Sequence, residues 1–277
     1  MANSTIALLY FPALYVIFAI PISNYFLSVR MPHPESDATY SSLYFMEGAN
    51  DAADRERNPN LDELARQIVD RTNAFRKKNL LPPISSDEQL TATASDFAKF
   101  MAETGQYGHT SDGKQPYQRA NLHGYEHCIV SENIAFKYNS KGIAQEELLT
   151  FFIESWKESP SHRKNMLDPD LTQTGVEVRL RGKRYYYAVQ MFGRPKAAII
   201  KFEIANQADI PLEYTLGDRS FALKPKRAHE QAICRKIAIV ATISGLRNPQ
   251  SYVPESGDHF EYRKNNQGLY SFIRVNP

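Results

Sequence analysis

Three short motifs supply the side chains of this sequence that could do chemistry. GHTS stands at residues 108–111, SENIA at 131–135 and WKESPSHR at 156–163. Together they contain two imidazoles and two carboxylates, namely His109, His162, Glu132 and Glu158. Imidazoles and carboxylates that meet in a polar cleft can bind a divalent cation or exchange protons with a ligand. We therefore take these four residues as the candidate site.

The chemistry of these residues leaves three interpretations open. Two imidazoles with two carboxylates favour Zn²⁺ if the side chains converge, and carboxylates alone suit harder divalent cations. A histidine with a pKa of about 6.5 could instead act as an acid or a base. In a purely structural interpretation, Glu132 accepts backbone N–H bonds and His109 donates to a buried carbonyl. We expect Asn133 and Trp156 to support the site structurally, with Trp156 on the apolar face of its helix.

Other residue patterns give weaker candidates. His123 and His127 are four residues apart, but Gly124 between them indicates a turn rather than a chelating helix. The sequence has no Gly-x-Ser-x-Gly motif and no glycine-rich phosphate loop, and no cysteine-protease signature surrounds Cys128. A nucleophilic hydrolase therefore has no clear nucleophile.

Composition excludes several classes of protein. The 277 residues carry a net charge of +2 without a run of Lys and Arg, which argues against nucleic-acid binding. Hydrophobic residues make up 42%, enough for one core or for two modest ones. With only Cys128 and Cys234, the chain is no disulfide-dense scaffold and has no cysteine-based zinc motif. We expect two free thiols, with a single bridge as the alternative.

The first sixty residues indicate export. Residues 6–22 contain no charged side chain, which is typical of the apolar part of a secretory signal or of a membrane anchor. No Lys or Arg precedes this stretch, and no clear cleavage site follows it. We interpret residues 1–30 as a signal or membrane-anchor segment and residues 31–60 as a linker. The expected location is therefore extracytoplasmic: secreted, periplasmic or membrane-anchored.

Helical periodicity dominates the region that carries the motifs. Capping boxes predict helices that begin after Asn60 and after Ser86. Further elements are expected as helices at 117–122 and 143–158, and as strands at 174–180 and 183–192. We expect Pro160 to end the last helix and the two strands to form a hairpin. Helices followed by a short antiparallel sheet predict an α+β sandwich.

The order of the motifs is similar to that of a known family. A helix, GHT, SENIA, WKESPSHRKNML, LTQTGVEV and YYAVQMFGRP follow one another with the spacing of the CAP superfamily, and the set resembles a bacterial member. That superfamily comprises the cysteine-rich secretory proteins, antigen 5 and the plant pathogenesis-related class 1 proteins. The resemblance covers residues 61–195. It implies an α-β-α sandwich with a central cleft, an extracytoplasmic setting and a binding role.

In that family, two His and two Glu line the cleft and can hold a divalent cation. The resemblance gives His109 and Glu132 the places of the first His and the first Glu, and Glu158 that of the second Glu. The second His departs from the pattern, because Asp170 or Leu171 stands at the usual position. His162 is instead typical of bacterial relatives, and either His162 or Asp170 completes the implied site.

Residues 196–277 carry short alternating apolar runs separated by turn signals. Five to seven short strands in this stretch predict a small all-β sandwich or barrel. We expect an accessory domain that positions the CAP-like domain at 61–195. The alternative is binding of a cell-wall polymer or a protein through exposed aromatic residues.

The sequence thus predicts an exported CAP-domain protein with a non-catalytic His/Glu cleft. The cleft is expected to bind a divalent cation such as zinc, together with a small-molecule, peptide or lipid ligand. Expected associations are with the membrane through the N-terminal segment and with the cell wall, and not with nucleic acid. The alternative is a metal-assisted or His/Glu acid–base hydrolase that acts on peptide or cell-wall substrates.

Overall fold

The computed structural model describes residues 58–243, 245 and 248–275. The predicted signal or anchor at 1–30, and most of the predicted linker at 31–60, lie outside these residues. Within the described ranges, no helix combines the length and the apolar character that crossing a bilayer requires.

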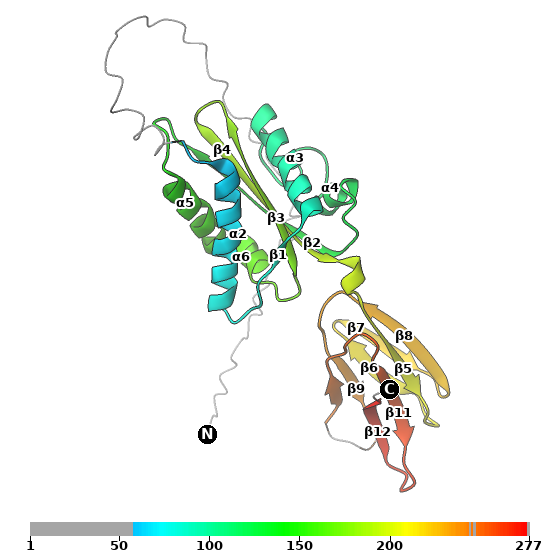
Figure 1. Cartoon of the computed structure of the whole chain (residues 1–277). Coiled ribbons are helices and arrows are strands. Elements are labelled where there is room, and N and C mark those ends of the chain that lie inside the picture. The colour runs from blue at the N-terminus through cyan, green and yellow to red at the C-terminus, as the bar shows by residue number, and fades with distance from the viewer. Residues whose placement is uncertain (1–57, 244, 246–247, 276–277) are drawn as a thin grey trace, which may run out of the picture.

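A four-stranded sheet with helices on both faces forms the first half of the described chain (Figure 1). The strand order is β1-β3-β4-β2, so β2 is an edge strand; β1 pairs parallel to β3, and the other pairs are antiparallel. Helices α2, α5 and α6 cover one face, and α3 and α4 cover the other. The strands are β1 (Ser85–Ser86), β2 (His127–Tyr138), β3 (Gln173–Arg181) and β4 (Tyr185–Pro195). The helices are α2 (Leu61–Lys78), α3 (Glu88–Thr104), α4 (Pro116–Leu122), α5 (Gln145–Glu158) and α6 (Pro160–Met166). The predicted α-β-α sandwich, and with it the α+β class, is confirmed.

The first helix follows directly from its sequence. The Asn60 side chain accepts a hydrogen bond from the backbone N–H of Glu63 at 3.1 Å, which is the predicted N-cap. The buried residues of α2 recur every four positions, at Leu64, Ile68, Thr72 and Arg76. This spacing places them on the one helix face that packs on the sheet.

Several helix boundaries differ from the prediction by one or two residues, and two differences have a clear cause. Helix α3 begins one residue late, because Asp87 rather than Ser86 accepts the N–H of Leu90, at 2.9 Å. Pro160 does not simply end the helical region, because it also begins α6. Proline is favourable in the first turn of a helix, where its missing N–H costs no hydrogen bond. His162 therefore lies on a helix.

Strand β2 is missing from the predicted elements. It pairs with β4 along its length, from His127 to Tyr138. The adjacent polar residues Glu132 and Asn133 point to opposite faces of the sheet, and both are buried. The strand therefore shows no alternation of apolar and polar residues, which is the signal that identifies a half-buried strand.

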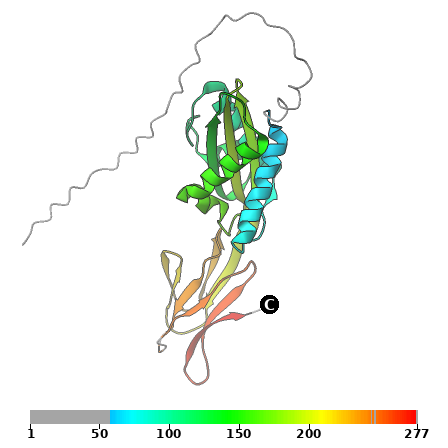
Figure 2. The same cartoon turned by 90° about the vertical axis from the view of Figure 1, so that its left-hand side faces the viewer.

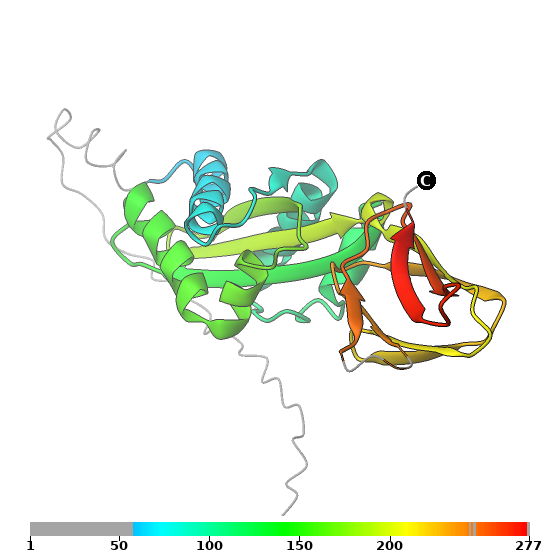
Figure 3. The ribbon, with the colours of Figure 1, turned by 90° about the horizontal axis from the view of Figure 1, so that it is seen from below.

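The strands between residues 200 and 275 form a β-sandwich that lies beyond the end of the first sheet (Figures 2 and 3). Its sheets have the orders β10-β9-β6-β7 and β12-β11-β5-β8. Among the described residues the sandwich therefore has eight strands, more than the predicted five to seven. Both sheets share one apolar core, in which Tyr214 and Phe260 are at most 2% exposed. The strands are β5 (Ile200–Asn206), β6 (Leu212–Leu216), β7 (Arg219–Leu223), β8 (Arg227–Ile233), β9 (Ile239–Thr242), β10 (Gln250–Tyr252), β11 (His259–Lys264) and β12 (Tyr270–Val275). The sandwich is thus confirmed over the barrel.

A disulfide joins the first sheet to the sandwich, so the expectation of two free thiols is wrong. Cys128 and Cys234 are bonded, with their Cα atoms 5.4 Å apart. The register of β2 against β4 shifts between His127 and Ile129, and Cys128 occupies this bulge. A bulge redirects a side chain out of the regular pleat, here towards the end of β8. The short helix η1 (Lys196–Ala198) connects β4 to β5 beside this bridge.

Candidate functional site

Three segments bring candidate residues to the free edge of the first sheet. Glu132 lies on the edge strand β2, His109 lies in the turn that follows α3, and His162 lies on α6. Because α3 and α6 cover opposite faces of the sheet, the two histidines reach β2 from opposite sides. Their ring centroids are 5.8 Å apart. Three of the four predicted residues therefore lie together.

The Glu132 carboxylate is the centre of this group. Its side chain has no exposed surface, and its Oε1 lies 2.7 Å from the Nδ1 of His109. Its Oε2 accepts a hydrogen bond from the Nη2 of Arg119 at 2.6 Å. A carboxylate paired with a guanidinium is ionised and can only accept, so the Nδ1 of His109 carries the proton. The His109 side chain is 38% exposed, which leaves its Nε2 for contact with solvent or a ligand.

Arg119 holds the turn that carries His109, although it belongs to none of the three motifs. Besides Glu132, its guanidinium bonds the Oδ1 of Asp112 and the carbonyl of Lys114, each at 2.8 Å, and the carbonyl of His109 at 2.9 Å. The guanidinium also lies over the ring of Phe97, 3.6 Å from its centroid. No motif points to Arg119, and its burial beside Ala120 on the short helix α4 becomes visible only in the structure.

Hydrogen bonds of two asparagine side chains hold His162 next to His109. The Nδ2 of Asn133 donates to the carbonyl of His162 at 3.1 Å, and the Nδ2 of Asn165 donates to the Oδ1 of Asn133 at 2.9 Å. Burial lowers the pKa of the His162 imidazole from its ordinary value of 6.5; the neighbouring His109 lowers it further, whereas Glu132 raises it. Because the first two effects prevail, His162 favours its neutral form.

Side-chain donors close the edge of β2 beside this group. Asn165 donates to the carbonyl of Glu132, and the indole N–H of Trp156 donates to that of Ile134, each at 3.1 Å. The hydroxyl of Tyr107 bonds the same Ile134 carbonyl at 3.2 Å. Burial raises the pKa of Tyr107 to about 12, and the charge of Glu132 adds to this, so the hydroxyl keeps its proton and donates. The edge is therefore not available for pairing here.

Glu158 is not part of the group. It is the last residue of α5 and is exposed, and among the described residues no hydrogen bond or ion pair joins it to Glu132 or to either histidine. Asp170, which stands near the usual place of the second family histidine, is committed elsewhere. Its carboxylate bonds Arg235 at 3.3 Å, at the contact with the sandwich.

The residues do not fit the predicted divalent cation in this arrangement. In the described part of the chain, no three His, Cys, Asp or Glu side chains gather where they could hold a metal ion. Each oxygen of Glu132 already takes part in a hydrogen bond and the side chain has no exposed surface, so a cation could reach the carboxylate only if Arg119 or His109 moved. Zinc or another divalent cation at this place thus remains a prediction from the sequence, without support from the geometry.

Both imidazoles are partly exposed, and in the described part of the chain neither has a partner nucleophile. Neither histidine lines any of four cavities of about 400 to 590 Å³ in the described residues. The hydroxyl oxygens of Ser111 and Ser131 are buried and bond neither ring. The hydroxyl of Ser161 pairs with that of Ser159 at 3.3 Å. Within the described residues, neither His109 nor His162 thus forms the hydroxyl–imidazole hydrogen bond that activates a serine nucleophile.

Comparison with known proteins decides the family of this region. Residues 69–192 match the model of the cysteine-rich secretory protein family, CAP. The chain contains a CAP domain. The match falls on the helix-covered sheet and includes His109, Glu132 and His162, and the predicted resemblance is thereby confirmed. The sandwich at 200–275 lies outside the match.

Individual relatives are similar to part of the chain. The uncharacterized protein YkwD of Bacillus subtilis is 31% identical over 112 residues, which are 40% of this chain and 40% of the relative. The uncharacterized membrane protein YlbC of the same species is 29% identical over 122 residues, 44% of this chain and 32% of the relative. The chain thus spans well under half the length of these curated relatives. An outer surface protein of Borrelia burgdorferi aligns with a TM-score of 0.43 and 22% identity, covering 48% of this chain and 94% of that one.

Glu132→Gln should destabilise the fold, because it leaves the buried Arg119 without its closest counter-charge. We expect the free energy of unfolding to fall by about 3 kcal/mol, the lower end for an uncompensated buried charge, since Asp112 still pairs with Arg119. The matched control Glu154→Gln removes an exposed partner of Lys157 and should cost less than about 1 kcal/mol. Urea unfolding compares them, and equal midpoints for the two variants would show that the Glu132 pair carries no such energy.

The lowered pKa of His162 should make stability depend on pH. Below pH 6.5 the unfolded chain takes up a proton at His162 that the folded chain resists, so the stability falls as the pH drops through this range. We expect an NMR titration of the His162 ring to give a midpoint below 6.5, which rises in His109→Asn as the like charge is removed. A midpoint at or above 6.5 in the unmodified chain contradicts this prediction.

Proposed function

We propose that this chain is an exported CAP-domain protein that binds a small polar molecule or a peptide through His109 and His162, without turnover. The proposal rests on the hydrogen bonds and the burial of Glu132. Both of its oxygens are bonded within the protein, to His109 and to Arg119. A carboxylate held in this way, without exposed surface, orients its neighbours but is not accessible to a ligand. Contact with the ligand is then left to the two imidazoles.

Export is the second part of the proposal. The bridge between Cys128 and Cys234 supports it, because disulfides persist in oxidising compartments and are rare in the cytosol. The uncharged stretch at residues 6–22 supports it from the sequence. A membrane anchor and a cleaved signal are both compatible with these two observations.

The surroundings of the imidazoles favour a polar ligand over a lipid. Arg163 and Lys164 lie on the same short helix α6 as His162 and are exposed, with Arg163 over the ring of Phe75. Their positive charge attracts carboxylate groups. An acyl chain needs an apolar cavity, and the cavities described above contain neither imidazole. A peptide or small molecule with a carboxylate, such as a cell-wall peptide fragment, suits these features.

An acid–base hydrolase is the second candidate function, and one contact favours it. Glu132 orients His109 through Nδ1, which is how a carboxylate orients the catalytic base in hydrolases with a Ser-His-Asp triad. Because no hydroxyl is bonded to the ring, His109 would have to activate a water molecule directly. This candidate predicts turnover that depends on both His109 and Glu132.

Binding and turnover are separated by exposing the full chain to a muropeptide digest, a tripeptide library and Zn²⁺ alone. We expect saturable shifts of the His109 and His162 ring signals in NMR with one of the two peptide probes, no saturable shift with Zn²⁺, and no new product by mass spectrometry. The shifts should be lost in His109→Ala and kept in the matched control His123→Ala. Product formation that disappears in His109→Ala would replace the proposal with the hydrolase, and ring signals that no probe moves would contradict it.

A further inference from the structure

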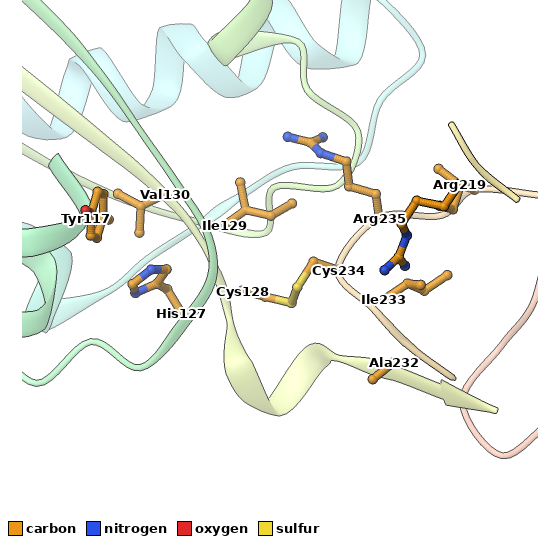
Figure 4. A pocket seen from close by; sticks show the side chains of 11 residues that line it. Tyr117, His127, Cys128, Ile129, Val130, Arg219, Ala232, Ile233, Cys234 and Arg235 are labelled. Carbon is orange, nitrogen blue, oxygen red and sulfur yellow. A yellow bond between two sulfur atoms is a disulfide. The ribbon is translucent and has the colours of Figure 1, made fainter. Parts of the chain in front are cut away.

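A second surface lies between the CAP domain and the β-sandwich. A groove of about 540 Å³ opens there, and Figure 4 shows the residues that line it on both sides of the disulfide. We call it the junction groove. Its lining includes Tyr117, Ile129, Val130, Arg219, Ala232 and Ile233. The residues of the imidazole site, His109, Glu132 and His162, do not line this groove.

One wall of the junction groove is an open strand edge of the CAP domain. Strand β2 is the edge of its sheet, and the carbonyls of Glu132 and Ile134 face outward, where side chains bond them. Backbone groups of alternate residues face the same way, so those of Val130 also face outward. Gly193 lies opposite Val130 in register, and its carbonyl bonds Thr172 on the far side of β4. The backbone of Val130 is thus left for another strand.

The other wall is an open strand edge of the sandwich. Strand β8 is the edge of its sheet and pairs only with β5 along the described strands. Lys201 of β5 lies opposite Ala232 in register, but its carbonyl bonds Gly257 on the side away from β8. The backbone groups of Ala232 therefore face the free edge as well. Two unpaired edges flank one groove.

The charge in the junction groove is unbalanced. Arg219 is exposed, and among the described residues its guanidinium has no carboxylate within ion-pair distance. Arg235, which also lines the groove, differs in being paired with Asp168 at 2.8 Å and with Asp170 at 3.3 Å. Apolar side chains such as Ile233 complete the lining. The groove therefore complements an occupant with aliphatic side chains and one carboxylate.

The two walls are held in place before anything binds. The bridge from Cys128 to Cys234 crosses the groove, as Figure 4 shows. The contact of Arg235 with Asp168 and Asp170 adds a second tie, and the N–H of Lys236 donates to the Oδ1 of Asp170 at 3.0 Å. A preformed groove spares the ligand the cost of ordering its walls.

We propose that the junction groove binds an extended acidic peptide as an added β-strand. The main chain of the peptide pairs with the free edge at Val130 or at Ala232, its aliphatic side chains contact the isoleucines, and its carboxylate bonds Arg219. Added strands of this kind draw affinity from main-chain hydrogen bonds and specificity from side-chain pockets. This binding activity is independent of the imidazole site.

The test uses the oxidised full chain and a fluorescein-labelled hexapeptide of alternating valine and threonine that ends in glutamate. We expect saturable binding by fluorescence anisotropy, weakened about tenfold in Arg219→Ala, the scale of one lost charge-assisted hydrogen bond. The control Arg227→Ala, an exposed arginine at the start of β8, should change affinity by less than about twofold. His109→Ala should leave binding unchanged, which separates this site from the proposed function.

Two further arms test the geometry. N-methylation of alternate peptide nitrogens should abolish binding, because it removes the main-chain donors. The double variant Cys128→Ser with Cys234→Ser should bind more weakly while its circular dichroism stays unchanged. Equal affinity for Arg219→Ala and Arg227→Ala, tolerance of N-methylation, or absence of saturable binding overturns the proposal. So does a stable dimer in sedimentation that excludes the peptide, because a second copy would then be the occupant.

Discussion

The buried carboxylate of Glu132 is the constraint on which the CAP domain depends. An ionised side chain without exposed surface is tolerated only if opposite charge and hydrogen-bond donors surround it. Arg119 provides the charge, and its Nη1 also bonds Asp112 and Lys114 in the turn at 109–114. Helix α4, this turn and strand β2 are therefore fixed relative to one another. The orientation of His109, and with it the proposed ligand site, follows from that arrangement.

Strand β2 contributes to both the imidazole site and the junction groove, because its free edge is closed by side chains in one part and open in another. Around Glu132 and Ile134, donors from Asn165, Trp156 and Tyr107 satisfy the outward carbonyls and prevent pairing. Towards its first residue the same edge lies open at Val130, and the bulge at Cys128 ties it to the sandwich. The part near the imidazoles thus presents side chains, whereas the part at the junction presents backbone. The two proposed ligand sites differ in chemistry for this reason.

Local signals made the helical part of the fold predictable, and long-range pairing did not. Periodic apolar residues and the cap at Asn60 determine α2 without reference to the rest of the chain. Strand β2 escaped prediction because its polar pair at 132 and 133 is satisfied only by partners distant in sequence. The disulfide joins Cys128 and Cys234, which are 106 positions apart, and no sequence feature near either cysteine indicates this pairing. In the same way, spacing indicated His109 and Glu132, but the role of Arg119 needed coordinates.

The protonation of His109 tests most directly whether Glu132 orders this site. A long-range ¹H–¹⁵N NMR spectrum of the full chain at neutral pH distinguishes a ring protonated at Nδ1 from one protonated at Nε2. If the 2.7 Å contact orders the ring, the neutral form carries its proton on Nδ1, and Glu132→Gln removes that preference. A ring protonated at Nε2, or a spectrum that the substitution leaves unchanged, would contradict the proposed role of the carboxylate.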